Sequence, residues 1–368
     1  MKGTAFETAF KEALERGKAK EERIGNIPYV RFANDFHGIP LGTVVLGETV
    51  VFGYPHIGRI LRLERGLSEH FEAPFFAEEK VDGYNVRVFW HQGEALALTR
   101  RGFLCQFTID RLPDLLPLDI FREHPETVVC AEVAGPDNPY LEEHPPYVTE
   151  DVRLFAFDLA RKGEQGFLPY REKIALLDAY AIPSAARFGR FSLQDVDALK
   201  ALMAKLDAEG KEGVVLKEDS PRDRRAKYVT ESSSLEDIRT GARSLLQLPS
   251  EYYTQRLLRL ALFLDEERIR PSRELYERLG EGLIDGILTM IEQYKREHKV
   301  YHTFRCRFRH EERARLFVES LKSLMGHAHL HVRRLEREGD FYLLEFDKIL
   351  PRATGFLGHL LSGGMVFD

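Results

Sequence analysis

The feature that most limits the fold of this chain is a change of pattern near residue 231. From about residue 74 to 230, compact apolar runs such as TVVCAEVAG and VRLFAFDL carry a charged or polar residue at one edge and alternate with Gly, Pro and Asp. Short runs rich in β-branched residues and bounded by turn residues are typical of strands. Two helical patterns interrupt them, at 170–181 and 193–210. The sequence therefore predicts an α+β domain of two antiparallel sheets with helices packed outside.

The pattern differs on either side of this domain. Residues 1–23 predict a charged amphipathic helix, and residues 28–53 predict short strands around turns. Beyond residue 231, three consecutive segments repeat apolar residues at three- and four-residue spacing, which predicts a helical region with the serines at 232–234 as candidate N-caps. The last segment, 301–368, predicts a small α+β domain that consists of a strand, a helix, a hairpin near Gly339 and a final helix. Because one core rarely exceeds roughly 300 residues, we expect four domains, at 1–66, 67–230, 231–300 and 301–368.

Composition narrows the functional classes. The net charge of -6 excludes a polycation that coats nucleic acid, so any nucleic-acid contact needs a local basic surface. No apolar run approaches the roughly 18 residues that a membrane span requires. The three cysteines, at 105, 130 and 306, are too scattered for a disulfide framework or a zinc site. These features predict a cytoplasmic protein without a membrane partner.

Lys80, in the segment EEKVDGYN, is the first candidate for chemistry. A lysine ammonium at its usual pKa is a poor nucleophile, so a reactive lysine needs burial or neighbouring cations that lower its pKa. A strand end followed by Asp82 and Gly83 offers such a place, because a glycine lets the chain turn tightly beside a ligand. By itself the segment also fits a salt-bridged lysine at a strand edge.

Five further segments follow in order, each with a polar or aromatic side chain near a strand end. The first arginine of TRRG, Arg100, offers a rigid fork of donors to a phosphate. A carboxylate at the end of an apolar strand needs a partner or a metal, and an aromatic ring there can stack on a purine. Taken singly, each has an ordinary structural explanation, and Lys217 is expected at a solvated strand end. The residues are Arg100, Glu132, Phe157, Glu212, Lys217 and Lys227.

Taken together, KVDGYN, TRRG, CAEVAG, LFAFDL, EGVVLK and RRAKYV resemble nucleotidyltransferase motifs I, Ia, III, IIIa, IV and V of the superfamily that contains ATP-dependent DNA ligases, RNA ligases and mRNA capping enzymes. Asn85 resembles the RNA ligase form of motif I. The segment GYPHIGR at 53–59 and the helical region resemble the archaeal-type, or third, RNA ligase family, whose members are homodimers and can circularise single-stranded RNA. The resemblance implies an adenylyltransferase domain of the ATP-grasp-like ligase kind.

The resemblance also implies roles for individual residues. Lys80 would attack the α-phosphate of ATP, forming lysyl-AMP and releasing pyrophosphate. Glu132 and Glu212 would hold the ribose or the divalent metals, Mg2+ or Mn2+, since hard cations prefer carboxylate oxygens. The other implied contacts are to the adenine edge by Glu78 or Glu79, to the ribose and phosphate by Asn85 and Arg100, to the face of the base by Phe157, and to the α-phosphate by Lys227.

The sequence thus predicts an ATP-dependent RNA ligase that joins 5′-phosphate and 3′-hydroxyl RNA ends through lysyl-AMP and RNA-adenylate intermediates. The alternatives are a DNA ligase, a capping guanylyltransferase and a non-catalytic nucleic-acid-binding relative. DNA ligases and capping enzymes follow motif V with a small β-barrel, whereas residues 231–300 have a helical pattern.

Two questions stay open at this stage. Arg225 stands where many ligases have a second motif V lysine, and it fits either a second cation or surface charge. The apolar stripe from Leu257 to Phe263 fits either a brace within one chain or a homodimer interface.

Overall fold

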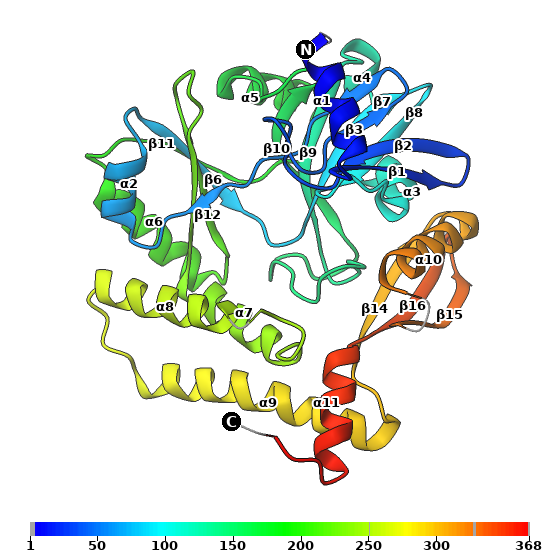
Figure 1. The fold of residues 1–368 in the computed structure, drawn as a ribbon. Helices are drawn as coiled ribbons and strands as arrows, with labels where there is room; N and C mark the ends of the chain where they lie inside the picture. The colour runs from blue at the N-terminus through cyan, green and yellow to red at the C-terminus, as the bar shows by residue number, and fades with distance from the viewer. Residues whose placement is uncertain (1–3, 250, 327–328, 367–368) are drawn as a thin grey trace.

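The computed structural model of the protein describes residues 4–249, 251–326 and 329–366, and it has the predicted α+β architecture (Figure 1). At the N-terminal end, one helix lies beside a four-stranded antiparallel sheet in the order β1-β2-β3-β4. These elements are α1 (Thr4–Glu15), β1 (Ala19–Ile24), β2 (Ile27–Phe32), β3 (Val44–Leu46) and β4 (Thr49–Val51).

The first helix ends at Glu15, so the prediction of a helix over 1–23 was wrong at its C-terminal end. Gly17 takes a φ of +65°, the left-handed conformation that commonly ends a helix. The chain turns there and enters β1, which forms a hairpin with β2. Strand pairing therefore overrides a local pattern of charged residues that reads equally well as a helix.

Two larger sheets form the centre of the molecule. One has the order β10-β9-β7-β8; the other has the order β11-β6-β12-β13-β5 and is antiparallel except at β5. The strands are β5 (Gly58–Arg59), β6 (Phe75–Lys80), β7 (Tyr84–His91), β8 (Glu94–Thr99), β9 (Thr127–Ala134), β10 (Arg153–Arg161), β11 (Arg187–Phe191), β12 (Gly213–Glu218) and β13 (Arg225–Val229). The helices between them are α2 (Leu63–His70), α3 (Gln106–Leu115), α4 (Ile120–Glu123), α5 (Tyr170–Ala179) and α6 (Val196–Ala208).

Helices α5 and α6 confirm the two predicted helical insertions, whereas α2, α3 and α4 were not predicted. The sequence of α3 contains the β-branched residues Thr108 and Ile109 and also Pro113, all of which weaken a helical signal. Most residues of α3 are buried. Tertiary packing therefore stabilises this helix. A local sequence pattern carries no information about such packing, so the helix was not predicted.

Each large sheet has its own core. The first sheet packs with α3 and with the C-terminal region, where the rings of Phe107 and Phe308 meet at 5.4 Å between centroids. The second sheet packs against α2 and α6. The chain passes from the second sheet to the first between Lys80, which ends β6, and Tyr84, which begins β7. Residues at this crossing therefore lie at the seam between the two sheets.

Helices follow β13, as predicted, and then a three-stranded sheet in the order β14-β16-β15. The hairpin turn lies at Gly339, which has a φ of +60°. The N-cap of α7 is Thr230, whose hydroxyl accepts from the amide of Ser233, so the expected caps at 232–234 were wrong. The elements are α7 (Glu231–Ala242), α8 (Glu251–Glu266), α9 (Arg273–Glu297), β14 (Tyr301–Phe308), α10 (Glu311–Met325), β15 (Leu330–Glu338), β16 (Phe341–Ile349) and α11 (Pro351–Leu361).

The apolar stripe of α8 is divided between two surroundings. Leu260 and Phe263 are buried within the chain, whereas Leu257 and Leu258 are 40% and 55% exposed. One part of the stripe thus braces the fold, and the other part faces outward. Among the described helices, none combines the length and the apolar character that crossing a bilayer requires.

Candidate active site

Lys80 is held at the seam by a turn that requires a glycine. A Cβ atom at Gly83 would come within 2.5 Å of the carbonyl oxygen of Val133 in β9. No other residue fits there unless the backbone of β9 moves. The glycine therefore lets the segment after Lys80 lie directly against the first sheet.

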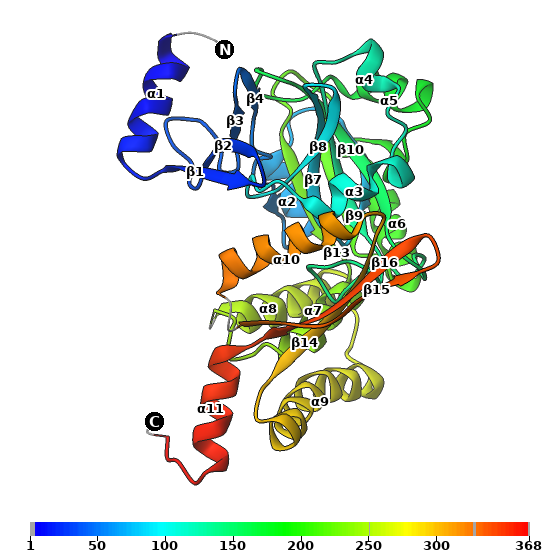
Figure 2. The same ribbon diagram turned by 90° about the vertical axis from the view of Figure 1, so that its right-hand side faces the viewer.

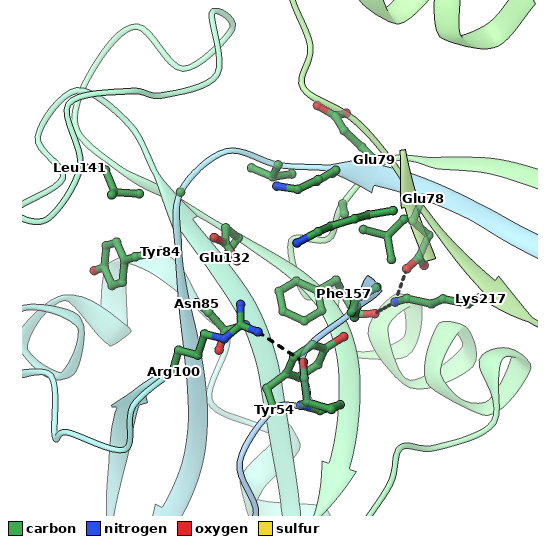
Figure 3. A pocket seen from close by; sticks show the side chains of 18 residues that line it. Tyr54, Glu78, Glu79, Tyr84, Asn85, Arg100, Glu132, Leu141, Phe157 and Lys217 are labelled. Atoms are coloured by element: carbon green, nitrogen blue, oxygen red, sulfur yellow. Dashed lines mark hydrogen bonds and ion pairs between the residues drawn. The ribbon is translucent and has the colours of Figure 1, made fainter. Parts of the chain in front are cut away.

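A cavity of about 350 Å³ opens at this seam (Figure 3). All of the predicted site residues line it except Glu212, which lines an adjoining cavity of about 400 Å³ that shares Glu79 and Lys80. The structure thus gathers side chains that are scattered along the chain. The predicted residues that line the first cavity are Glu78, Glu79, Lys80, Asn85, Arg100, Glu132, Phe157 and Lys227.

The amine of Lys80 is paired with Glu212, whose Oε1 lies 2.5 Å from Nζ. Burial by itself lowers the pKa of an ammonium, but Glu212, Glu132 and Asp82 outweigh it and hold the pKa of Lys80 above its usual value. In the absence of a nucleotide the amine is therefore protonated, and a protonated amine is not a nucleophile.

The carboxylates around Lys80 are incompletely paired, because only Glu212 among them forms an ion pair within the described residues, with Lys80. Burial raises the pKa of Glu132 to about 8 although Lys80 opposes the shift, and burial together with Glu212 raises the pKa of Asp82 to about 8. Within the described chain, Glu212 Oε2 and Asn85 Oδ1 are buried without a hydrogen-bond partner. Because unpaired buried oxygens are unfavourable, the group favours a further cation. We call Lys80, Asp82, Glu132 and Glu212 the Lys80 group.

Glu132 and Glu212 were predicted as metal ligands, and their chemistry fits Mg2+ or Mn2+, which prefer oxygen donors. Over the residues that the structure describes, no three His, Cys, Asp or Glu side chains converge on one point as a complete metal site. Magnesium is commonly held by one or two carboxylates, with water and substrate phosphates as the other ligands. The residues therefore fit a metal that is shared with a bound nucleotide.

Three cations face this acidic group. Burial, Lys80 and Arg59 lower the pKa of Lys227 to about 8. Arg59 lies beside Lys227 in the register of β5 and β13, and the Nε atoms of Arg59 and Arg100 are buried without a partner in the described part of the chain. Crowded, incompletely paired guanidinium and ammonium groups suit phosphate oxygens. Sequence reasoning assigned no role to Arg59, although the segment GYPHIGR contains it.

Lys217 is buried, so the expectation of a solvated strand end was wrong. Its Nζ donates to Glu78 Oε2 at 2.6 Å, to the carbonyl oxygen of Phe157 at 2.6 Å and to Asp158 Oδ1 at 3.1 Å. Lys173 in α5 donates to the other oxygen of Glu78 at 2.6 Å. The strand β12 is central in its sheet, and β6 and β10 supply the partners of Lys217, which the sequence of β12 alone does not reveal.

The side chain of Arg225 is 8% exposed and forms two ion pairs, so it is neither surface charge nor a free second cation. Its guanidinium donates to Asp158 Oδ2 at 2.6 Å, to Asp223 Oδ2 at 2.7 Å and to the hydroxyl of Tyr54 at 2.9 Å. Burial alone raises the pKa of a carboxyl, but Arg225 and Lys217 hold the pKa of Asp158 well below its usual value. We call Glu78, Asp158, Lys173, Lys217 and Arg225 the floor network.

The two glutamates before Lys80 point in different directions (Figure 3). The carboxylate of Glu78 is turned toward Lys217, whereas Glu79 accepts a hydrogen bond from the hydroxyl of Tyr147 at 2.5 Å. Phe157 packs edge-on against Tyr54, with 5.2 Å between ring centroids, and lines the cavity. Glu78 is therefore the glutamate that is tied, through Lys217, to the strand that carries the aromatic ring.

Two family models match the chain. The model described as RNA ligase matches residues 73–229, and the model described as the C-terminal region of ligase Pab1020 matches residues 240–364. The first match contains both large sheets except β5, together with most of the cavity lining. The second contains the end of α7, the helices α8 and α9 and the C-terminal sheet.

Similar proteins match along nearly the whole chain. A protein of Aquifex aeolicus that is provisionally named an ATP-dependent DNA ligase is 51% identical, with 98% of this chain and 100% of that chain covered and a TM-score of 0.94. An archaeal ATP-dependent RNA ligase is 28% identical, with 98% and 96% covered and a TM-score of 0.87. An uncharacterised protein of Methanocaldococcus jannaschii is 27% identical over an alignment of 365 positions that covers 94% of this chain and 92% of that protein.

Proposed function

Because the chain belongs to the archaeal-type family of ATP-dependent RNA ligases, we propose that it joins a 5′-phosphate to a 3′-hydroxyl end of RNA, with Lys80 as the covalent carrier of AMP. The observation that carries the proposal is the amine of Lys80 at a cavity lined by carboxylates, cations and an aromatic ring. Three steps would share the cavity: AMP transfer to Lys80, AMP transfer to the RNA 5′-phosphate, and sealing by the 3′-hydroxyl with release of AMP.

In the first step, Lys80 Nζ would attack the α-phosphorus of ATP. A nitrogen–phosphorus bond forms, the bond to the oxygen that bridges to the β-phosphate breaks, and pyrophosphate leaves with the electron pair. The amine must lose a proton first, and Glu212, at 2.5 Å from Nζ, is placed to accept it. Lys227 and Arg100 would neutralise the charge on the α-phosphate, which is the main requirement of phosphoryl transfer.

We propose Mg2+ or Mn2+ as the cofactor, with Glu132 and Glu212 as its ligands. A divalent cation here would neutralise phosphate charge and would favour the neutral form of Lys80 by repulsion. The chain contributes the unpaired Glu212 oxygen and the buried carboxyl of Glu132. Formation of the AMP adduct should stop when the metal is chelated and should resume when either metal is added.

Glu78 and Phe157 form the proposed base subsite. Lys173 and Lys217 hold both oxygens of Glu78, so the carboxylate stays ionised and can act only as an acceptor. On its Watson–Crick edge adenine presents one donor to such an acceptor, its amino group, whereas guanine presents two, its ring N–H and its amino group. The acceptor therefore fits either base, and the proposal of ATP rather than GTP is supported by the similarity to ATP-dependent RNA ligases. Incubation with labelled ATP and labelled GTP tests the choice.

One observation favours a second candidate, DNA ligation, because the relative with 51% identity carries that provisional name. Asn85 in motif I and the helices that follow β13 support RNA instead. Joining assays with 5′-phosphorylated single-stranded RNA and with nicked duplex DNA separate the two. Product from DNA alone would replace the RNA proposal.

The decisive experiment is the intact mass of the protein after incubation with ATP and magnesium. We expect the wild type to gain one AMP and Lys80→Ala to gain none, because the acceptor nitrogen is missing. Lys205→Ala, which removes a lysine with a 71% exposed side chain, is the matched control and should gain AMP as the wild type does. A wild type that stays unmodified would overturn the proposal.

We also propose a homodimer that forms through α8 and α9. Leu257 and Leu258 on α8 and Tyr276, Ile284 and Leu288 on α9 are between 40% and 62% exposed. Large apolar residues exposed on neighbouring helices commonly mark an interface. Light scattering should give the dimer mass for the wild type and the monomer mass for a Leu258→Glu and Leu288→Glu double variant. A monomeric wild type would contradict the proposal.

A further inference from the structure

A second cavity, of about 650 Å³, adjoins the one at Lys80 and shares Tyr84, Asn85 and Arg100 with it. Its walls come from distant parts of the chain: β1 and β2, the turn after β8, helix α10 and strand β16. Both views show α10 lying below β1, β2 and α3 (Figures 1 and 2). We call this cavity the side channel. It opens onto the place where the reacting phosphate would lie.

The side channel is basic, although the chain carries a net charge of -6. Its only acidic lining residue among the described side chains is Glu22, which is already paired with Arg31 at 2.9 Å. Arg23, Arg101 and Lys348 form no ion pair within the described chain. The cationic lining residues are Arg23, Arg31, Arg100, Arg101 and Lys348.

The turn after β8 directs two consecutive arginines to different places. The amide of Gly102 donates to the carbonyl of Thr99 at 2.9 Å, which places Arg100 and Arg101 at the centre of a tight turn. Arg100 lines both cavities, whereas Arg101 lines only the side channel and is exposed. The turn is fixed from outside, because a Cβ atom at Gly42 would lie 2.1 Å from the carbonyl oxygen of Arg100. The N-terminal sheet thus positions both arginines.

Aromatic and hydroxyl groups accompany the cations. The guanidinium of Arg31 lies over the ring of Phe103 at 3.8 Å, and Tyr29 and Tyr140 also line the side channel. Ser320 and Ser323 add hydroxyls from α10, among other residues of that helix. Cations combined with aromatic rings are the chemistry that binds single-stranded nucleic acid, through phosphate contacts and base stacking.

From this geometry we propose that the side channel binds the single-stranded RNA end whose phosphate reacts at Lys80, with Arg23 and Arg101 contacting its backbone. The inference rests on the proposed RNA ligase function and assigns the path of that substrate. It also gives the N-terminal sheet, which the RNA ligase family model does not include, a role in holding RNA. Arg100, at the boundary, would contact the phosphate at the end of the strand.

The test uses the full-length protein and a single-stranded oligoribonucleotide that carries a 5′-phosphate. Arg23→Glu and Arg101→Glu change exposed side chains, and the control Arg65→Glu makes the same charge change on α2, on the other side of the molecule (Figure 1). RNA affinity and its salt dependence are measured for each variant, together with the formation of lysyl-AMP from ATP in the absence of RNA.

We expect each channel variant to bind the RNA at least about tenfold more weakly, since a charge-assisted contact is lost. The slope of log affinity against log salt should fall by about 0.7 for each lost contact with a single strand. Lysyl-AMP formation should stay at the wild-type level in all three variants, and Arg65→Glu should bind RNA as the wild type does.

Unchanged affinity and salt slope in the Arg23→Glu and Arg101→Glu double variant would overturn the proposal, as would an equal loss in Arg65→Glu. If the wild type binds single-stranded DNA of the same sequence as tightly as the RNA, the proposal that the side channel selects RNA is wrong, and the channel binds single strands of either kind. These failures differ from failure of the proposed function, in which the wild type forms no lysyl-AMP at all.

Discussion

The floor network and the Lys80 group contain the same residue types but reach opposite electrostatic balances. In the floor network, two carboxylates face three cations, and the pKa values of Glu78 and Asp158 are lowered despite burial. In the Lys80 group, only Glu212 forms an ion pair among the described residues, with Lys80, and burial raises the pKa of Glu132 and Asp82 to about 8. Both groups contribute to the lining of the cavity at Lys80, the floor network through Glu78 and Lys217 and the Lys80 group through Lys80 and Glu132.

The difference in charge pairing assigns a structural role to the floor network and a functional role to the Lys80 group. A buried ion network whose charges are all paired is complete, and removal of one member leaves an uncompensated charge. A buried group with unpaired oxygens and raised pKa values is unfavourable by itself and gains stability when it binds a cation. The floor network should therefore control folding, and the Lys80 group should control AMP transfer.

The largest expected effect is on folding, from Lys217→Met. The substitution keeps the length of the side chain but leaves Glu78 and Asp158 with less positive charge, so we expect the free energy of unfolding to fall by about 3 to 5 kcal/mol. Urea denaturation measures it. Lys205→Met, which removes one partner of an exposed ion pair, should cause no measurable change. An unchanged free energy of unfolding in Lys217→Met would contradict the structural role of the floor network.

The next effect is on chemistry, from Glu212→Gln. The variant loses the carboxylate that pairs with Lys80 and is the proposed metal ligand, so the rate of lysyl-AMP formation should fall on the order of 100-fold. The free energy of unfolding should change by less than about 1 kcal/mol, because one of three competing carboxylates is removed. Single-turnover mass spectrometry and urea denaturation give the two values. Loss of stability with normal AMP transfer would reverse the assignment.

Metal binding should stabilise the protein through the Lys80 group. At a Mn2+ concentration ten times the dissociation constant, linkage gives about 1.4 kcal/mol of added stability. Thermal unfolding with and without Mn2+ measures the shift, and we expect Glu132→Gln to lose most of it because a ligand is removed. An equal shift in Glu132→Gln and wild type would place the metal elsewhere.

The smallest effect is the dependence of stability on pH. Glu132 has a folded pKa of about 8, above its unfolded value, so the folded protein holds a proton that the unfolded chain releases. The free energy of unfolding should therefore fall as the pH rises from the unfolded pKa of Glu132 to its folded pKa of about 8. The slope should stay below the roughly 1.4 kcal/mol per pH unit of one full proton. Urea midpoints at a series of pH values should show a flatter slope in Glu132→Gln.

Much of the fold could be predicted because its signals are local. The runs that contain Lys80, Glu132 and Phe157 form strands as expected, and the three helices after Thr230 follow the apolar spacing. The errors lie where packing decides. Helix α3 contains Pro113 and yet forms, packed against the C-terminal region, whereas the predicted end of the first helix became a strand.

The sequence by itself determined the order of motifs, the strand that ends at Lys80 and the identity of the groups that can meet a phosphate, because these depend on residue type and spacing. Only the tertiary structure decided which charges are matched. The sequence predicts Lys217 as a solvated cation and leaves the role of Arg225 open, but in the structure both side chains are hydrogen-bonded to Asp158. Electrostatic balance depends on distance and burial across sheets, and neither quantity is encoded in any single segment.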